Sequence, residues 1–320
     1  MTKRILVTGA AGQIGSELVP FLREKYGSDN VVACGHHKPL PEEIVNSGPS
    51  DYVDVRNARE LAEKIRKYNV NTVYHLAAIL SASGEKNPQL AWDININGLY
   101  NILEVAREFK YAIFIPSSIA AFGPGTPKVN TPQDTIQRPT SMYGITKVAG
   151  ELLADYYWLK YGVDARGVRY PGIISYVTPP GGGTTDYAVE IFYEAILNKK
   201  YKCFLRHNTM LDMMYMPDAL KAAVELMEAD PTNLKHRNAF NVTSFSFTPA
   251  MLADEIKKHI PDFVMEYEID PIRQGIADSW PDSMDDSCAR EEWGWKPDYD
   301  FPAMVKDMIE KLMVKLRKSI

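Results

Sequence analysis

The sequence predicts an α/β protein built on a doubly wound parallel sheet. Short apolar runs alternate with helical patterns, and the first run passes through a glycine-rich turn into a helix. Strands of four to six residues are expected at 4–8, 31–34, 52–55, 72–76, 112–115 and 165–169. Helices are expected between them, among others at 58–68, 89–109 and 141–161. Ligands of such sheets bind over the carboxyl ends of the strands.

The first strand leads into the turn Gly9-Ala-Ala-Gly12-Gln13-Ile14-Gly15. Free backbone N–H groups and the positive end of the helix dipole at such a turn suit a pyrophosphate. Gly9 would make the tight turn, Gly12 would let the backbone approach the phosphates, and Gly15 would let the helix pack closely. The spacing differs from the commoner G-x-G-x-x-G, and an ordinary strand-to-helix turn is the alternative. The turn favours a Rossmann-type dinucleotide site.

Two later segments carry groups suited to proton transfer. Ser118 follows the strand at 112–115, and Tyr143 and Lys147 open the helix at 141–161. Residues four apart share one helix face, so the ammonium can lie near the phenol. A nearby positive charge favours the phenolate and makes tyrosine a usable base near neutral pH. Taken singly, these residues are also common as solvated helix neighbours and as a helix approach.

Together these motifs resemble the extended short-chain dehydrogenase/reductases over nearly the whole chain. The resemblance is carried by the glycine turn, His75-Leu76-Ala77-Ala78, Asn95-Ile-Asn97-Gly98, Ser118, Tyr143-x-x-x-Lys147 and Tyr170-Pro171-Gly172. A more specific likeness lies in residues 169–175, 183–188 and 213–218 and in Trp280-Pro281. These segments look like the L-threonine 3-dehydrogenases of the sugar-epimerase-like branch, which oxidise threonine at C3 to 2-amino-3-oxobutanoate with NAD.

The resemblance implies the catalytic roles. Tyr143, as a phenolate, would take the proton of the threonine C3 hydroxyl. Lys147 would stabilise the phenolate and bind the nicotinamide ribose, and Ser118 would hydrogen-bond the reacting oxygen. The cofactor contacts implied by the family are Gly9, Gly12, Gln13, Ile14, Gly15, Asp54, Val55, Leu76, Ala77, Ala78, Asn97, Tyr143, Lys147, Tyr170, Gly172 and Ile173.

One position departs from the family pattern. NAD-preferring members place an acidic residue after the second strand, where it accepts hydrogen bonds from the adenosine ribose. This chain has Gly35 there, followed by His36-His37-Lys38, which could bind a 2′-phosphate or could be solvated loop residues. We expect NAD on the family likeness alone, and NADP stays open.

A free amino acid also needs partners for its two charges, because unpaired charges in a closed site are costly. Thr184, Thr185 and Asp186 offer hydroxyls, N–H groups and a carboxylate, and Ser81 and Trp280 are expected beside them. Ser118 and Tyr143 would complete the substrate site. The alternatives are helix capping at residues 184–186, a turn serine and a core tryptophan.

Two other functions share the same motifs. A nucleotide-sugar epimerase or dehydratase would keep the glycine turn, Ser118, Tyr143 and Lys147, but it needs a long groove with basic residues for the diphosphate. Residues 183–188 look suited to a smaller substrate. A non-catalytic cofactor sensor of the same fold is the second alternative, and the presence of both Tyr143 and Lys147 argues against it.

Composition adds expectations about organisation and partners. The break of the βα alternation after Pro171 predicts a dinucleotide-binding domain at 1–170 and a substrate-binding lobe at 171–320, with 211–216 and 239–242 returning to the main sheet. A net charge of −5 gives no support for nucleic acid or an anionic membrane as partner. The amino end shows no apolar signal segment, so a cytoplasmic protein is expected.

Metal and subunit expectations come from residue spacing and from the family. Cys34, Cys203 and Cys288 lie far apart without a Cys-x-x-Cys pair, and the six histidines are scattered, so no protein-ligated metal is expected. The helices at 89–109 and 141–161 resemble those that pair across a two-fold axis in relatives. A homodimer is therefore implied by the resemblance.

Overall fold

The computed structural model describes residues 2–179, 181 and 183–317. Its centre is a six-stranded parallel sheet in the order β3-β2-β1-β4-β5-β7. The strands are β1 (Ile5–Thr8), β2 (Val31–Gly35), β3 (Ser50–Tyr52), β4 (Thr72–His75), β5 (Ala112–Phe114) and β7 (Ala165–Arg166). After β3 the chain returns to the other side of β1. This reversal between β1 and β4 is where doubly wound sheets bind ligands, and the predicted fold class is confirmed.

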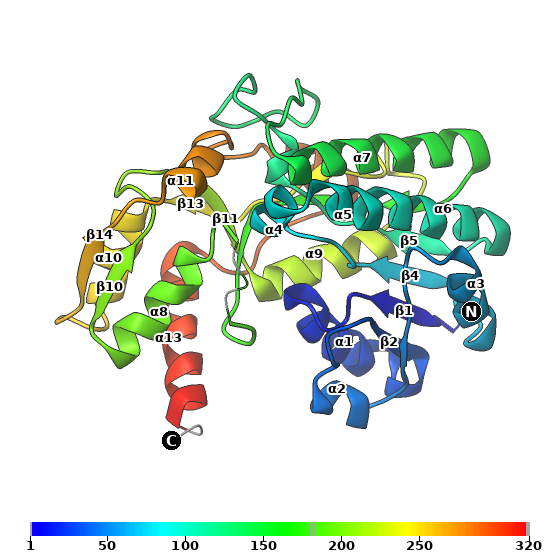
Figure 1. The fold of residues 1–320 in the computed structure, drawn as a ribbon, viewed down its shortest axis with the longest axis horizontal. Coiled ribbons are helices and arrows are strands. Elements are labelled where there is room, and N and C mark those ends of the chain that lie inside the picture. Colours follow the sequence, from blue (N-terminus) through cyan, green and yellow to red (C-terminus); the bar gives the residue numbers. More distant parts are fainter. Residues whose placement is uncertain (1, 180, 182, 318–320) are drawn as a thin grey trace.

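Helices cover both faces of this sheet (Figure 1). Along β1, Ile5 and Val7 belong to the core under α1 (Gln13–Tyr26) and α9 (Met216–Glu228). Leu6 belongs to the core under α3 (Ala58–Lys67), α6 (Gly98–Phe109) and α7 (Met142–Tyr161). Successive strand residues point to opposite faces, so a strand covered on both sides must be apolar throughout. This is why β1 reads as a continuous apolar run.

Local signals set the bounds of the longest helix. The side chain of Ser141 accepts a hydrogen bond from the Gly144 amide and caps the start of α7, and Gly162 ends the helix at φ +66°. The expected helix at 89–109 is interrupted. It consists of α5 (Pro88–Trp92), a π-helical turn η2 (Asp93–Asn97) and α6.

Two sequence expectations need adjustment. The strand expected at 52–55 is β3 at 50–52, because the chain turns after Val53, where the Asn57 amide bonds to the Asp54 carbonyl. The segments 211–216 and 239–242 lie in two smaller sheets beside the main one. These sheets have the orders β13-β11-β9 and β12-β8-β6. Their strands are β6 (Ser117–Ser118), β8 (Val168–Tyr170), β9 (Gly172–Ile174), β11 (Leu211–Tyr215), β12 (Phe240–Asn241) and β13 (Phe245–Phe247).

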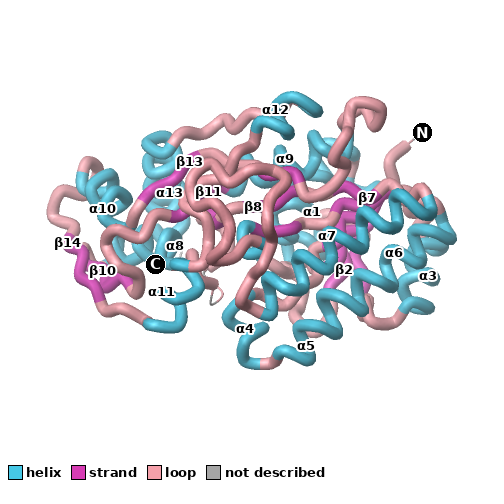
Figure 2. The backbone as a smooth tube through the Cα atoms, turned by 90° about the horizontal axis from the view of Figure 1, so that it is seen from above, coloured by secondary structure: helices cyan, strands magenta, loops and turns pink. Residues whose placement is uncertain are grey.

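The remaining elements form a smaller lobe with its own core (Figures 1 and 2). Its helices are α8 (Tyr187–Leu197), α10 (Pro249–Lys257), α11 (Pro271–Asp278) and α13 (Phe301–Arg317), and β10 (Lys200–Cys203) pairs with β14 (Val264–Tyr267). The other short elements are η1 (Ser28–Asn30), α2 (Glu42–Asn46), α4 (Ser81–Lys86), η3 (Ile119–Ala121) and α12 (Ser287–Trp293). Among the described helices, none has the length and apolar character needed to cross a membrane.

Candidate active site

A cleft of about 230 Å³ opens where the main sheet meets the smaller lobe. Its walls come from the turn after β1, the segment after β4, β6, α7, β9, the segment before α8 and the loop after α11. The predicted site residues that line it are Gly9, Gly12, Gln13, Ile14, Gly15, Leu76, Ala78, Ser81, Ser118, Tyr143, Lys147, Tyr170, Gly172, Ile173, Thr184, Thr185, Asp186 and Trp280. The fold therefore brings residues predicted for cofactor binding, for catalysis and for substrate binding to the same cleft.

The glycine turn forms a cradle that larger residues would fill. Gly9 has φ +68°, and a Cβ there would lie 2.7 Å from the Ala77 nitrogen. A Cβ on Gly15 would lie 2.4 Å from the Gly9 carbonyl oxygen. Gly12 caps α1 without any side-chain hydrogen bond, so the amides of the first helical turn face the cleft without a side-chain acceptor. This arrangement fits the pyrophosphate of a dinucleotide.

Tyr143 and Lys147 lie one turn apart on α7 and both line the cleft. The Lys147 Nζ atom is 5.3 Å from the centre of the Tyr143 ring. It donates a 2.6 Å hydrogen bond to the carbonyl oxygen of Pro116, which fixes the ammonium beside the end of β5. The Ser118 hydroxyl oxygen, on β6, accepts a hydrogen bond of 3.2 Å from the Ala120 amide. The arrangement places a hydroxyl, a phenol and an ammonium around one space.

His75 lies at the end of β4 and is buried. Burial, helped by the positive charge of Lys147, lowers the pKa of His75 to about 3. Its Nδ1 atom is 2.9 Å from the Thr8 hydroxyl oxygen. His75 is therefore neutral at physiological pH, and Lys147 supplies the positive charge at this end of the cleft.

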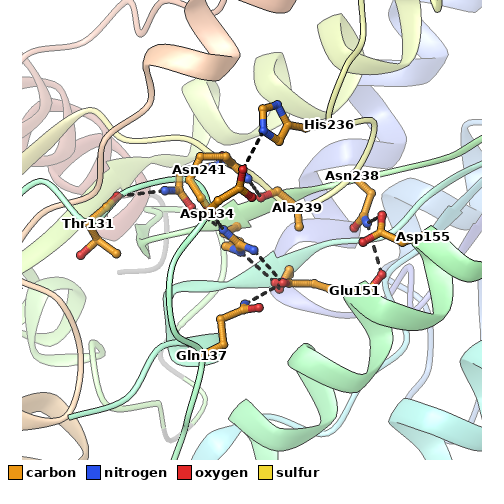
Figure 3. Close-up of polar contacts among 12 residues, drawn as sticks. Thr131, Asp134, Gln137, Glu151, Asp155, His236, Asn238, Ala239 and Asn241 are labelled. Carbon is orange, nitrogen blue, oxygen red and sulfur yellow. Dashed lines mark hydrogen bonds and ion pairs between the residues drawn. The ribbon is translucent and has the colours of Figure 1, made fainter. Parts of the chain in front are cut away.

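A buried ion pair supports β6 and α7 from behind, and the sequence reasoning missed it. Arg169 on β8 donates to both carboxylate oxygens of Glu151 at 3.0 and 2.9 Å. Glu151 lies one turn after Lys147 and also accepts a hydrogen bond from Ser117. It accepts another from Gln137 (Figure 3). The only signal in the sequence was a carboxylate on the inward face of a helix. The network fixes the segment that carries Ser118.

The far end of the cleft is polar. Thr184 is buried, and its hydroxyl has no hydrogen-bond partner among the described residues. An Asp186 carboxylate oxygen accepts a 2.7 Å hydrogen bond from the Gly183 amide. Ser81 begins α4 and is buried, and Trp280 is 7% exposed. A buried hydroxyl without a partner costs free energy unless a ligand engages it.

Four of the residues predicted to contact the cofactor do not line the cleft: Asp54, Val55, Ala77 and Asn97. Ala77 borders a small adjoining cavity of about 30 Å³. Asn97 is exposed and donates to Asp93, whereas Asn95 borders that cavity and bonds to Ile79. The other two predicted residues are Asp54, which is ion-paired, and Val55, which is buried.

Gly35, at the end of β2, lies against the ring of Tyr52 and leaves no room for the acidic side chain that the family pattern places there. A Cβ on Gly35 would lie 3.0 Å from the Tyr52 ring, which covers this position from β3. Asp54, nearby, contacts Arg56 at 2.7 Å and His36 at 3.5 Å. Hydrogen bonds from Arg56 lower the pKa of Asp54 to about 2. The carboxylate available here therefore belongs to Asp54 and is fully ionised.

The fold and the cleft together define a Rossmann-type protein with a dinucleotide cradle and a Ser, Tyr and Lys group. The family model "NAD dependent epimerase/dehydratase family" matches residues 5–243. Because this match covers most of the chain, the protein belongs to the NAD dependent epimerase/dehydratase family. Membership and site together support a nicotinamide cofactor without separating NAD from NADP.

Comparison with individual proteins gives close matches over the full length. An "uncharacterized epimerase/dehydratase" of Staphylococcus saprophyticus is 52% identical and covers 99% of both chains. The structure of an L-threonine dehydrogenase from Clostridium difficile is 57% identical, covers 98% of both chains and superposes with a TM-score of 0.96. A structure described as a monomeric L-threonine 3-dehydrogenase from a metagenome is 47% identical, with 97% of this chain and 99% of that chain covered and a TM-score of 0.92.

Proposed function

We propose that this protein oxidises the C3 hydroxyl of L-threonine to 2-amino-3-oxobutanoate with NAD. The observation that carries the proposal is the shared cleft, in which Ser118, Tyr143 and Lys147 lie between the glycine turn and the polar end at Thr184. The full-length similarity to structures of L-threonine dehydrogenases supports the same substrate.

In this mechanism Tyr143, as a phenolate, accepts the proton of the C3 hydroxyl. The Lys147 ammonium stabilises the negative charge on the phenol oxygen, and the Pro116 carbonyl keeps the ammonium in place. Ser118 hydrogen-bonds the reacting oxygen and orients it toward Tyr143. The glycine turn and Lys147 would hold the dinucleotide, which would supply the hydride acceptor for C3. Positioning and acid–base help of this kind account for the catalytic effect of the protein groups.

The polar end of the cleft holds the amino-acid portion of the substrate. The Thr184 hydroxyl donates to the substrate carboxylate and gains a partner that none of the residues 2–179, 181 and 183–317 supplies. Thr185 adds a second hydroxyl, and the Asp186 carboxylate offers the negative charge that an ammonium requires. Ser81 and Trp280 close the space from two other elements, which excludes water from the reacting atoms.

A nucleotide-sugar epimerase or dehydratase is the second candidate, because the family name and the curated relative both point in that direction. Among the described residues that line the cleft, Lys147 is the only lysine or arginine. A sugar nucleotide carries a second diphosphate and needs further cations to bind it. The lining therefore favours a small substrate.

We propose NAD as the preferred cofactor. His36 contacts Asp54, and Arg56 contacts both Asp54 and Asp93. Arg56 is therefore already engaged by two carboxylates, which disfavours a 2′-phosphate beside it, whereas the exposed Lys38 makes NADP the outcome that the assay below must test. Cofactor contacts at Asp54, Val55, Ala77 and Asn97 remain predictions.

We also propose a homodimer through α6 and α7. Exposed apolar side chains gather on α7, with Leu152 62%, Tyr156 51% and Leu159 82% exposed. Burying such side chains against a second copy is favourable. One similar structure is described as monomeric, and light scattering of the purified protein at several concentrations decides between the two states. The cytoplasmic location remains a prediction from the sequence.

Absorbance of the reduced nicotinamide tests the activity directly. The protein is mixed with NAD and L-threonine, with NAD and a nucleotide sugar, and with NADP and L-threonine. The proposal expects reduction with the first mixture and a much lower rate with NADP. Turnover of the nucleotide sugar without oxidation of threonine would transfer the assignment to the second candidate.

A further inference from the structure

Three side chains capable of binding a metal converge outside the cleft. His236 lies in the loop before β12, and Cys288 and Glu292 lie one turn apart on α12. One ligand atom from each lies within 4.8 Å of the other two. None of the three lines the cleft described above. We call these three residues the His236 cluster.

Glu292 is oriented by the backbone of the loop that carries His236. One of its carboxylate oxygens accepts hydrogen bonds from the amides of Lys235, at 2.6 Å, and His236, at 3.1 Å. The other oxygen bonds to Nδ1 of the His236 ring. The carboxylate is 5% exposed, so its position is set by protein groups rather than by solvent. One oxygen of Glu292 is thus aimed at the space shared with His236 and Cys288.

The His236 ring is held by two further contacts. Its Nε2 atom is 3.3 Å from a carboxylate oxygen of Asp134 (Figure 3). Its face packs near the buried Phe240 ring, with centroids 5.9 Å apart. Metal-binding histidines commonly give the proton of their second nitrogen to a carboxylate, which sets the tautomer and orients the first nitrogen toward the metal. In His236 a carboxylate faces each ring nitrogen, so Asp134 can hold the Nε2 proton while Nδ1 exchanges its contact with Glu292 for the metal.

The surroundings of Cys288 attract cations. Four carboxylates act on the Cys288 thiol through their negative charge. These carboxylates are Asp134, Asp285, Glu291 and Glu292. Cys288 is half-buried, whereas the other two cysteines are buried, so an ion can reach it from solvent. Concentrated negative charge beside an accessible sulfur favours a divalent cation.

We propose that the His236 cluster binds Zn²⁺ through Nδ1 of His236, the sulfur of Cys288 and one carboxylate oxygen of Glu292. Nitrogen, sulfur and oxygen donors in one site suit this metal, and its tetrahedral geometry separates such ligands by roughly 3.5 Å. To reach that spacing, Nδ1 of His236 and the Glu292 oxygen that are now hydrogen-bonded must move apart to admit the ion. The thiol of Cys288 releases its proton to solvent as the sulfur–zinc bond forms, and water takes the fourth position.

The sequence hides this site because its ligands come from distant segments. The expectation of no metal rested on scattered histidines and widely spaced cysteines, and only the fold brings residue 236 to α12. The ion would tie the loop before β12 to α12. Two residues after His236, the side-chain amide of Asn238 donates to the backbone carbonyl oxygen of Glu151 at 3.2 Å. The metal would therefore also help to hold this loop against α7. The role is structural and separate from the proposed threonine oxidation.

Cobalt binding and thiol protection test the proposal without any substrate. The chelator-treated protein is titrated with Co²⁺, and we expect one ion per chain with a thiolate-to-cobalt absorption band that Zn²⁺ displaces. Cys288→Ser should lose that band, and His236→Gln should lose binding. His259→Gln changes an exposed histidine outside the His236 cluster, and this variant should bind Co²⁺ as the unchanged protein does. Circular dichroism verifies that each variant is folded.

The second measurement follows the alkylation of Cys288 by iodoacetamide with mass spectrometry. Zinc at a hundred times its dissociation constant should slow alkylation about a hundredfold and raise the melting temperature. Alkylation at the same rate with and without zinc overturns the proposal. So does a cobalt spectrum that Cys288→Ser or His236→Gln leaves unchanged, because the ion would then bind elsewhere.

Discussion

The Lys147 ammonium lies 5.3 Å from the centre of the Tyr143 ring, one turn further along the same face of α7. It donates a hydrogen bond to the Pro116 carbonyl oxygen, which orients it into the cleft. The charge therefore lies beside the phenol before any ligand binds. A base assembled in this way needs no conformational change before it accepts a proton.

Replacing Tyr143 with phenylalanine tests the proposed base. The ring keeps its packing and only the hydroxyl is removed, so the protein should fold normally. We expect the rate of threonine oxidation to fall by about 10²- to 10⁴-fold, the usual contribution of a general base. Reduced nicotinamide absorbance measures the rate, and the melting temperature serves as the control. A rate close to that of the unchanged protein would remove Tyr143 from the mechanism.

Replacing Thr184 with valine tests the substrate clamp. Valine has nearly the same shape but lacks the buried hydroxyl, for which the described part of the chain offers no hydrogen-bond partner. The melting temperature without ligands should stay the same or rise, because a buried polar group is removed. The KM for threonine should rise by roughly 10- to 100-fold, as expected for loss of a hydrogen bond to a charged group.

The two measurements on Thr184→Val separate binding from folding. A fall in stability together with an unchanged KM would show that the hydroxyl serves the fold. Thr185→Ala is the companion variant, and it should also raise the KM if both hydroxyls hold the substrate.

Residues near one another in sequence were predicted well. The glycine turn follows from a strand that runs into a helix, and the pairing of Tyr143 with Lys147 follows from the helical period. The π-helical turn at 93–97 was not predicted, because a regular period does not reveal one inserted residue. In this turn Asn95 points to the inside and bonds to Thr146, whereas Asn97 points to solvent.

Residues brought together only by the fold were missed. Arg169 belongs to a strand, and its partner Glu151 belongs to a helix 18 positions earlier in the sequence. Neither strand nor helix periodicity indicates that their charged groups meet. The His236 cluster is hidden for the same reason. The length of β3 was also misjudged, because Val53 and Val55 are buried in a turn rather than in a strand.

Replacing Glu151 with alanine tests the support behind β6. Arg169 would be left buried without its counter-charge, and such losses destabilise proteins by about 3–5 kcal/mol. We expect a lower midpoint in urea denaturation with little change in the slope. Glu63→Ala is a control, since Glu63 is a helix carboxylate paired with Arg59 at an exposed position. Equal effects of the two variants would contradict a special role for the buried pair.

Replacing Glu17 with glutamine tests a buried carboxyl next to the glycine turn. Glu17 lies on α1 and accepts a hydrogen bond from Ser175, which follows β9. Burial raises the pKa of Glu17 from 4.5 to about 7, so the folded protein favours the neutral form. The folded protein then binds more protons than the unfolded chain between these values, and the stability provided by this group is lost as the pH rises through about 7.

Glutamine cannot ionise, so the Glu17→Gln protein lacks this loss of stability. Its melting temperature should be close to that of the unchanged protein at about pH 5, and the difference should grow several-fold in favour of the variant by about pH 8. Glu24→Gln is the matched control, because Glu24 is exposed on the same helix and should show no such divergence. Parallel melting curves for Glu17→Gln and the unchanged protein across this pH range would show that the Glu17 carboxyl is ionised in the folded state. Its burial against Ser175 would then contribute nothing to the pH dependence of stability.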